Sequence, residues 1–216
     1  MDIPLLTETA LKLFFMLTPF FVLSMFVTMT TEMETSARRG LALRATVSIN
    51  AVCLILYFFG RPLFNIFAIT VDSFRIGAGI ILMLTAIELV RGTAHASSSK
   101  QIRSATKKTP GGGDVGDLAV VPLTIPYVVG PGTIGMLLVL GGDAGIGLSI
   151  RLNTCAGIVL ASTATGLMLY FSDGLMKRLG HRSLQILSKI TGLVLAALSA
   201  QSVMTGLLNI ISAHKP

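Results

Sequence analysis

The sequence predicts an all-α polytopic membrane protein with six transmembrane helices, arranged as two inverted three-helix repeats in which helices 1 and 4 are broken. Three observations support this prediction: the composition is apolar, the hydrophobic runs have the length of a membrane span, and the second half repeats the first. Of the 216 residues, 52% are hydrophobic and only 12% are charged, with a mean hydropathy of +0.79. Soluble domains carry about 25% charged residues, so water is not the main solvent of this chain.

Six stretches approach the roughly 20 residues that a helix needs to cross the hydrocarbon core of a bilayer. Five of them contain no charged side chain. The third carries Arg75 and Glu88 near its two ends, where long side chains can reach the polar interface. The six stretches are 13–31, 45–60, 74–90, 118–142, 152–172 and 190–213.

The distribution of Lys and Arg predicts the orientation of these spans. Six spans place loops 1, 3 and 5 on one side of the membrane, and that side holds twelve of the seventeen basic residues. Because basic loops stay in the cytoplasm, both termini are expected outside the cytoplasm of a bacterial inner membrane. The net charge of +7 is therefore a topology signal, and no nucleic-acid partner is expected.

An internal repeat divides the chain into residues 1–93 and 118–216, joined by a cytoplasmic linker at 94–117. The linker is polar and contains Pro110-Gly111-Gly112-Gly113, which is typical of flexible connections. Since each half has three spans, the second half must enter the membrane upside down, as in many secondary transporters. Three pairs of segments share a spacing of 112 to 114 residues: Leu56-Tyr57-Phe58 with Leu169-Tyr170-Phe171, Arg75-Ile76 with Lys189-Ile190, and Pro19 with Pro131.

Proline and glycine predict a break in the first span of each half. A proline in mid-helix removes a backbone donor, so the fourth span should break near Gly130 and resume at Pro131, a favoured first helical position. The N–H groups after such a break would attract a carboxylate. Matched breaks predict a solute site between the repeats, although kinks that only shape packing are the alternative. The candidate substrate-binding residues are Thr18, Pro19, Ser24, Thr124, Pro126, Gly130, Pro131, Gly132, Thr133 and Ile134.

Three charged residues, Arg75, Glu88 and Lys189, are candidates for a vestibule or for coupling. Interfacial anchoring of the two cations, and a local ion pair between Glu88 and Arg91, are the alternatives. An enzyme is not expected, because the spans offer no histidine and no carboxylate at mid-depth. No metal site or cofactor is expected either. The three histidines, His95, His181 and His214, are not spaced from Cys, Asp or Glu as metal ligands usually are.

The chain resembles the MarC family, six-span inner-membrane proteins grouped with small neutral amino-acid transporters of the SnatA type. The resemblance covers almost the whole chain and is most specific in the run from Val121 to Ile134, which holds the fourth-span break. Two shorter segments, 72–79 and 189–192, also match. The first break departs from the family pattern, because Thr18 to Ser24 lacks the acidic or amide residue, the glycine and the second proline.

The resemblance implies a transporter or exporter of glycine, alanine, serine or threonine, whose partners are this solute and the lipid bilayer. A channel would need a polar stripe along one face, and none is evident. A non-transporting membrane scaffold or envelope-stress-related protein is the alternative that the altered first break favours. Association of identical chains is left open by the sequence.

Overall fold

Helices make up the described part of the chain, which is residues 3–31, 33–93, 128–142 and 147–213 of a computed structural model. No strand occurs within these ranges. The predicted linker and the first part of the fourth predicted span lie outside them. The helices are α1 (Ile3–Met16), α2 (Pro19–Met29), α3 (Thr35–Phe67), α4 (Val71–Arg91), α7 (Pro131–Gly142), α8 (Leu148–Tyr170) and α9 (Ser172–Ala213).

The described residues contain four or five candidate membrane spans. Helices α3, α4, α8 and the segment Arg182–Ala213 of α9 are each long and apolar enough to cross a bilayer. Helices α1 and α2 make a fifth span if they are taken together, with a bend of 44° between them. Helix α7 has only 12 residues. The predicted all-α membrane class is therefore confirmed.

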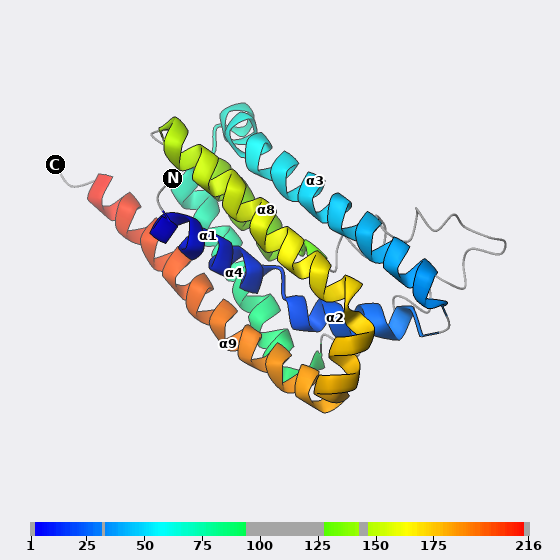
Figure 1. The fold of residues 1–216 in the computed structure, drawn as a ribbon. Coiled ribbons are helices and arrows are strands. Elements are labelled where there is room, and N and C mark those ends of the chain that lie inside the picture. The colour runs from blue at the N-terminus through cyan, green and yellow to red at the C-terminus, as the bar shows by residue number, and fades with distance from the viewer. Residues whose placement is uncertain (1–2, 32, 94–127, 143–146, 214–216) are drawn as a thin grey trace, which may run out of the picture.

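The helices form one bundle in which elements from the two halves of the chain lie side by side (Figure 1). Helix α4 packs along α9, α3 packs against α7 and α8, α1 against α8, and α2 against α9. We call the end of the bundle that holds Ile3, Phe67 and Ala213 the terminal end. We call the end that holds Thr35 and Ser172 the opposite end.

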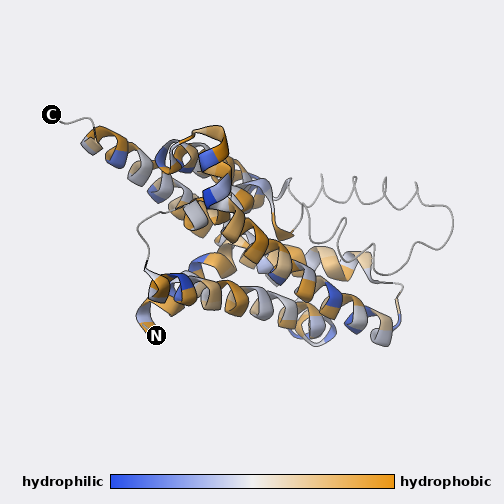
Figure 2. Cartoon of the chain, turned by 90° about the horizontal axis from the view of Figure 1, so that it is seen from above, coloured by the Kyte–Doolittle hydropathy of each residue, from blue (hydrophilic) through white to orange (hydrophobic). Residues whose placement is uncertain are grey.

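Hydrophobic residues are spread along the helices of the bundle (Figure 2), and many of their side chains are exposed on its outside. Ile55, Phe58, Leu193 and Leu208 are each more than half exposed. In a soluble helix such positions are polar, so these outward faces suit hydrocarbon. Helix α9 kinks at Gly180, where φ is 71°, and the kink separates residues 172–179 from the membrane-spanning part.

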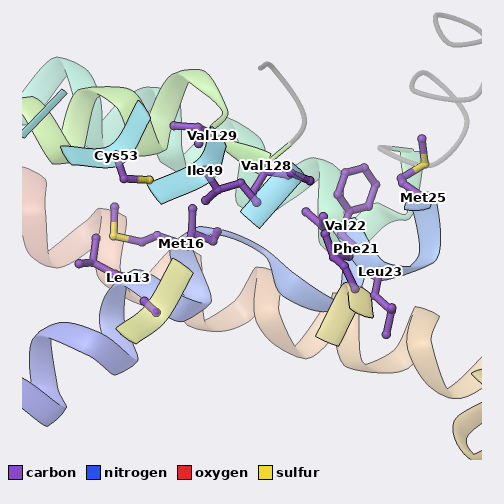
Figure 3. Close-up of a cluster of buried hydrophobic side chains, with 14 of the residues drawn as sticks. Leu13, Met16, Phe21, Val22, Leu23, Met25, Ile49, Cys53, Val128 and Val129 are labelled. Atoms are coloured by element: carbon purple, nitrogen blue, oxygen red, sulfur yellow. The ribbon is translucent and has the colours of Figure 1, made fainter. Parts of the chain in front are cut away.

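Glycines allow α3 and α7 to approach closely. A Cβ atom on Gly141 would lie 1.7 Å from the carbonyl oxygen of Tyr57, and one on Gly60 would lie 2.2 Å from that of Leu138. Such close contacts replace the hydrophobic driving force that lipid cannot provide. Side chains from both halves then meet in one core, where Val128 and Val129 lie beside Ile49 (Figure 3).

Candidate functional site

The joint between α1 and α2 is a strained break in the middle of the bundle. Thr18 adopts the left-handed conformation, with φ 47° and ψ 54°, and Pro19 occupies the first turn of α2. A residue before proline is pushed out of the right-handed helical region, and a β-branched residue at positive φ is strained. Thr18 and Pro19 are both buried, so this strain is held by the surrounding helices.

A second break precedes α7, and it meets the first. Helix α7 begins at Pro131, as predicted, and its first helical hydrogen bond runs from the Ile134 N–H to the Gly130 carbonyl oxygen at 2.9 Å. The Thr133 hydroxyl donates to the carbonyl oxygen of Met16 at 2.9 Å. Met16 is the last residue of α1, so a hydroxyl from one break binds a carbonyl that the other break leaves without a helical partner.

A cavity of about 310 Å³ lies beside this contact, between α1, α4, α7, α8 and α9. Its apolar lining includes Met16 and Met136. Met136 follows Thr133 on α7 by about one helical turn. The polar lining of the cavity is concentrated on α1 and α9, with contributions from α4 and α8. The polar and charged residues that line it are Glu8, Thr9, Lys12, Arg75, Thr154, Gln201, Ser202 and Thr205.

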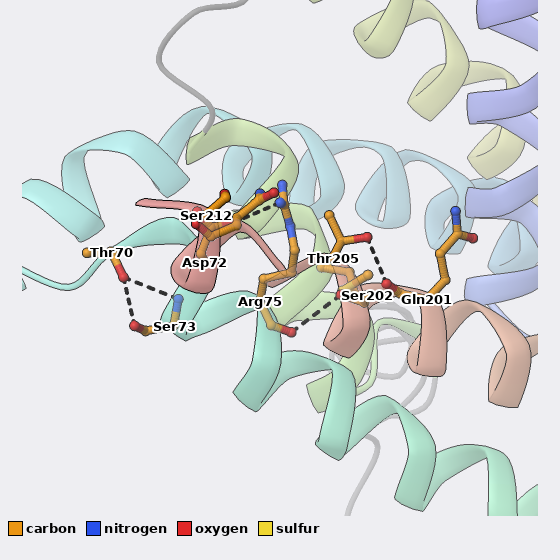
Figure 4. Close-up of polar contacts among 10 residues, drawn as sticks. Thr70, Asp72, Ser73, Arg75, Gln201, Ser202, Thr205 and Ser212 are labelled. Carbon is orange, nitrogen blue, oxygen red and sulfur yellow. Dashed lines mark hydrogen bonds and ion pairs between the residues drawn. The ribbon is translucent and has the colours of Figure 1, made fainter. Parts of the chain in front are cut away.

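Polar contacts hold the start of α4 against the end of α9 (Figure 4). Arg75 pairs with Asp72 at 3.0 Å, and the Asn209 amide donates to the same carboxylate oxygen at 2.9 Å. The Ser202 hydroxyl donates to the Arg75 carbonyl oxygen at 3.4 Å. Gln201 points away from this group, toward α1 (Figure 4). These contacts fix one wall of the cavity.

The structure brings some predicted site residues together and separates others. Thr18, Pro19, Gly130 and Thr133 lie at the two breaks. Ser24 is buried on α2, and its hydroxyl has no hydrogen-bond partner among the described residues. Thr124 and Pro126 lie outside the described residues.

Other predicted residues of the fourth span serve packing or face outward. Pro131 and Ile134 line a separate groove of about 320 Å³ between α4 and α7. Gly132 is buried against α4, where an added Cβ would lie 2.7 Å from the Cα of Leu82. Gly132 therefore allows the two helices to touch and has no side chain to offer a solute.

The three charged candidates do not converge on one site. Arg75 lines the cavity. Glu88 is exposed toward the far end of α4, and in the described part of the chain it forms no ion pair with Arg91. Lys189 is exposed on α9 and lines a small pocket of about 160 Å³ with Gly92. Of these three residues, Arg75 alone lines the cavity.

Sequence reasoning did not single out several residues that line the cavity. Glu8 and Lys12 form an i, i+4 ion pair on α1, and the polar cluster Gln201, Ser202 and Thr205 interrupts an otherwise apolar span. Both features can be read from the sequence. A polar cluster inside a membrane helix usually faces protein or water, so it indicates a lining position. Within the described ranges, no group of three His, Cys, Asp or Glu residues is placed to hold a metal ion.

Comparison with known proteins gives matches over nearly the full length. The model of the MarC family, described as an integral membrane protein family, matches residues 3–211. The UPF0056 membrane protein MJ1677 of Methanocaldococcus jannaschii is 27% identical, over 91% of this chain and 92% of its own. UPF0056 membrane protein YhcE of Escherichia coli is also 27% identical, over 95% and 93%. A UPF0056 membrane protein of Aquifex aeolicus is 28% identical, over 96% and 94%. No solved structure matches this chain.

Proposed function

The chain belongs to the MarC family of integral membrane proteins, and we propose that it carries small neutral amino acids across a bacterial inner membrane. Glycine, alanine, serine and threonine are the proposed solutes. The observation that carries the proposal is the Thr133 hydrogen bond to Met16, which joins the two broken helices next to a cavity with polar and charged walls.

The packing of the helices supports an inverted repeat with six spans. In such a repeat, α2 of the first half corresponds to α7 of the second, α3 to α8 and α4 to α9. The contact between α2 and α9 therefore has a counterpart in the contact between α7 and α4, and both contacts are observed. In this proposal, residues 118–127 complete the fourth span, and both termini lie outside the cytoplasm. Inverted repeats with paired breaks at mid-membrane are typical of secondary transporters.

The cavity has the size and the charges that an amino acid requires. Its volume of about 310 Å³ is at the lower end of the roughly 300–1,000 Å³ found for ligand pockets, which favours a small solute. Arg75, which also pairs with Asp72, is placed to bind a carboxylate, and Glu8, which also pairs with Lys12, is placed to bind an ammonium group. The apolar lining, which includes Leu13 and Val139, suits a short aliphatic side chain.

Flux of labelled alanine and glycine in proteoliposomes tests the proposal. We expect uptake above that of protein-free liposomes, with competition by unlabelled serine and threonine. Gln201→Leu should lower this flux by on the order of tenfold, because a polar group of the bound solute loses its partner in the cavity. Gln185→Leu is the matched control, since it makes the same change on α9 at the opposite end of the bundle. The absence of flux for every small amino acid would contradict the proposal and favour a non-transporting scaffold.

A further inference from the structure

At the end of the bundle opposite the cavity, two neighbouring arginines on α3 contact three other segments. Arg38, near the start of α3, forms an ion pair with Asp173 at the start of α9. A second nitrogen of its guanidinium donates to the carbonyl oxygen of Thr30, just after α2, at 2.6 Å. The neighbouring Arg39 lies over the ring of Tyr170, at the end of α8, 5.3 Å from its centroid. Four helices from both halves are therefore tied together here.

Most of the residues packed against Arg38 from the core side are buried. The Arg38 side chain is 14% exposed, and that of its partner Asp173 is 40% exposed. Thr30, Leu41 and Ser172 are buried, as is Phe26 on the α2 turn below. The cavity thus lies between the breaks and the terminal end, whereas several side chains packed near Arg38 are buried.

Two buried polar atoms at this contact have no hydrogen-bond partner in the described part of the chain. They are the Nε of Arg38 and the hydroxyl oxygen of Ser172. A partly exposed ion pair adds little net stability, and an unpaired buried donor has a free-energy cost. The closed end can therefore be close in free energy to an open arrangement.

The repeat places an equivalent arginine at the other end of the bundle. Ser36 and Arg38 recur as Ser149 and Arg151 at a spacing of 113 residues, the same as for the Leu-Tyr-Phe pair. Arg151 is near the start of α8, next to Ile150, which lines the cavity. Equivalent arginines thus lie at the end beside the cavity and at the end away from it.

We propose that Arg38, Asp173 and the Thr30 carbonyl form a latch that closes the solute pathway on its cytoplasmic side. Release of the latch opens that side while the terminal end closes. This inference rests on the proposed transport function and on its membrane orientation. The latch itself is tested without any solute.

Thiol accessibility in a Cys53→Ala, Cys155→Ala background tests the latch. One reporter is Ser24→Cys, on α2 between the break and the latch, and the other is Thr205→Cys, in the cavity. A membrane-impermeant thiol reagent is applied to inverted and to right-side-out vesicles. In the parent, we expect Thr205→Cys to react in right-side-out vesicles and Ser24→Cys to react slowly in both.

Removal of the latch should change the thiol reactivity of the two reporter cysteines in opposite directions. With Arg38→Gln or Asp173→Asn, reaction of Ser24→Cys in inverted vesicles should rise several-fold, because loss of a partly exposed ion pair shifts a two-state equilibrium by up to about fivefold. Reaction of Thr205→Cys should fall. Arg44→Gln makes an equal charge change at an exposed position of α3. It should leave the reaction rates of both reporters unchanged.

The remaining outcomes separate a latch from a structural contact. Faster reaction of both reporters would mean general loosening and would overturn the latch, as would no change in Ser24→Cys. A rise only in right-side-out vesicles would overturn its cytoplasmic placement. The exchange Arg38→Asp with Asp173→Arg should restore part of the parent pattern, and failure to restore any would also count against the latch. Opposed reporters without amino-acid flux in the parent would instead contradict the transport function alone.

Discussion

The two breaks occupy matching places in the proposed repeat but differ in their chemistry. The first break bends at Thr18, in a strained left-handed conformation, and the chain continues with Phe20 and Phe21. The second contains Gly130 and Gly132 and provides the Thr133 hydroxyl. The position equivalent to Thr133, 112 residues earlier, is Phe21, which has no hydroxyl. The second half therefore supplies the donor and the first half supplies only a backbone acceptor, so the joined site is asymmetric.

The largest effect is expected where the second break depends on close packing. Gly132→Leu places side-chain atoms within about 3 Å of the Leu82 backbone, and overpacking of this kind costs about 1–3 kcal/mol or more. We expect a large loss of folded protein, measured by size-exclusion chromatography and thermal unfolding in detergent.

Gly77→Leu is the control for this substitution, because a Cβ at Gly77 meets nothing within 4 Å. Its stability should remain near that of the parent. If both variants fold equally well, the contact between α4 and α7 is looser than described, and Gly132 becomes available as a binding residue.

A smaller effect is expected from the bond that joins the two breaks. Thr133→Val removes the hydroxyl donor and leaves the buried Met16 carbonyl without its hydrogen bond. This should lower the free energy of unfolding by about 1–3 kcal/mol. The melting temperature and the alanine flux should both fall, whereas Thr133→Ser should preserve both because it retains the hydroxyl. Equal behaviour of the valine and serine variants would mean that the hydrogen bond does not couple the two halves.

The smallest effect tests the strain at the first break. Thr18→Gly makes this joint resemble the second and removes a β-branched residue from positive φ, so stability should rise by about 1 kcal/mol. Thr28→Gly, at an exposed helical position of α2, should lower stability by roughly the same amount. Thermal unfolding of both variants measures the difference in sign, and a loss of stability in Thr18→Gly would remove the argument for strain.

Local chain chemistry determined the membrane class, the helices and the positions of the breaks. Apolar runs of span length specify helices in lipid because only a helix pairs its own backbone groups there. Pro19 and Pro131 fix where helices resume because the pyrrolidine ring acts on its immediate neighbours. These effects depend on residues a few positions apart, so they can be read from the sequence of this chain.

Tertiary packing alone decided which of these features meet. Thr133 reaches Met16 across 117 residues, and Arg38 reaches Asp173 across 135. Packing also turned Pro131 toward an outer groove and Gly132 onto α4, and it separated Arg75 from Glu88 and Lys189. Such outcomes depend on how helices of opposite direction pack against one another. The periodicity and local propensity of a single helix do not determine that packing.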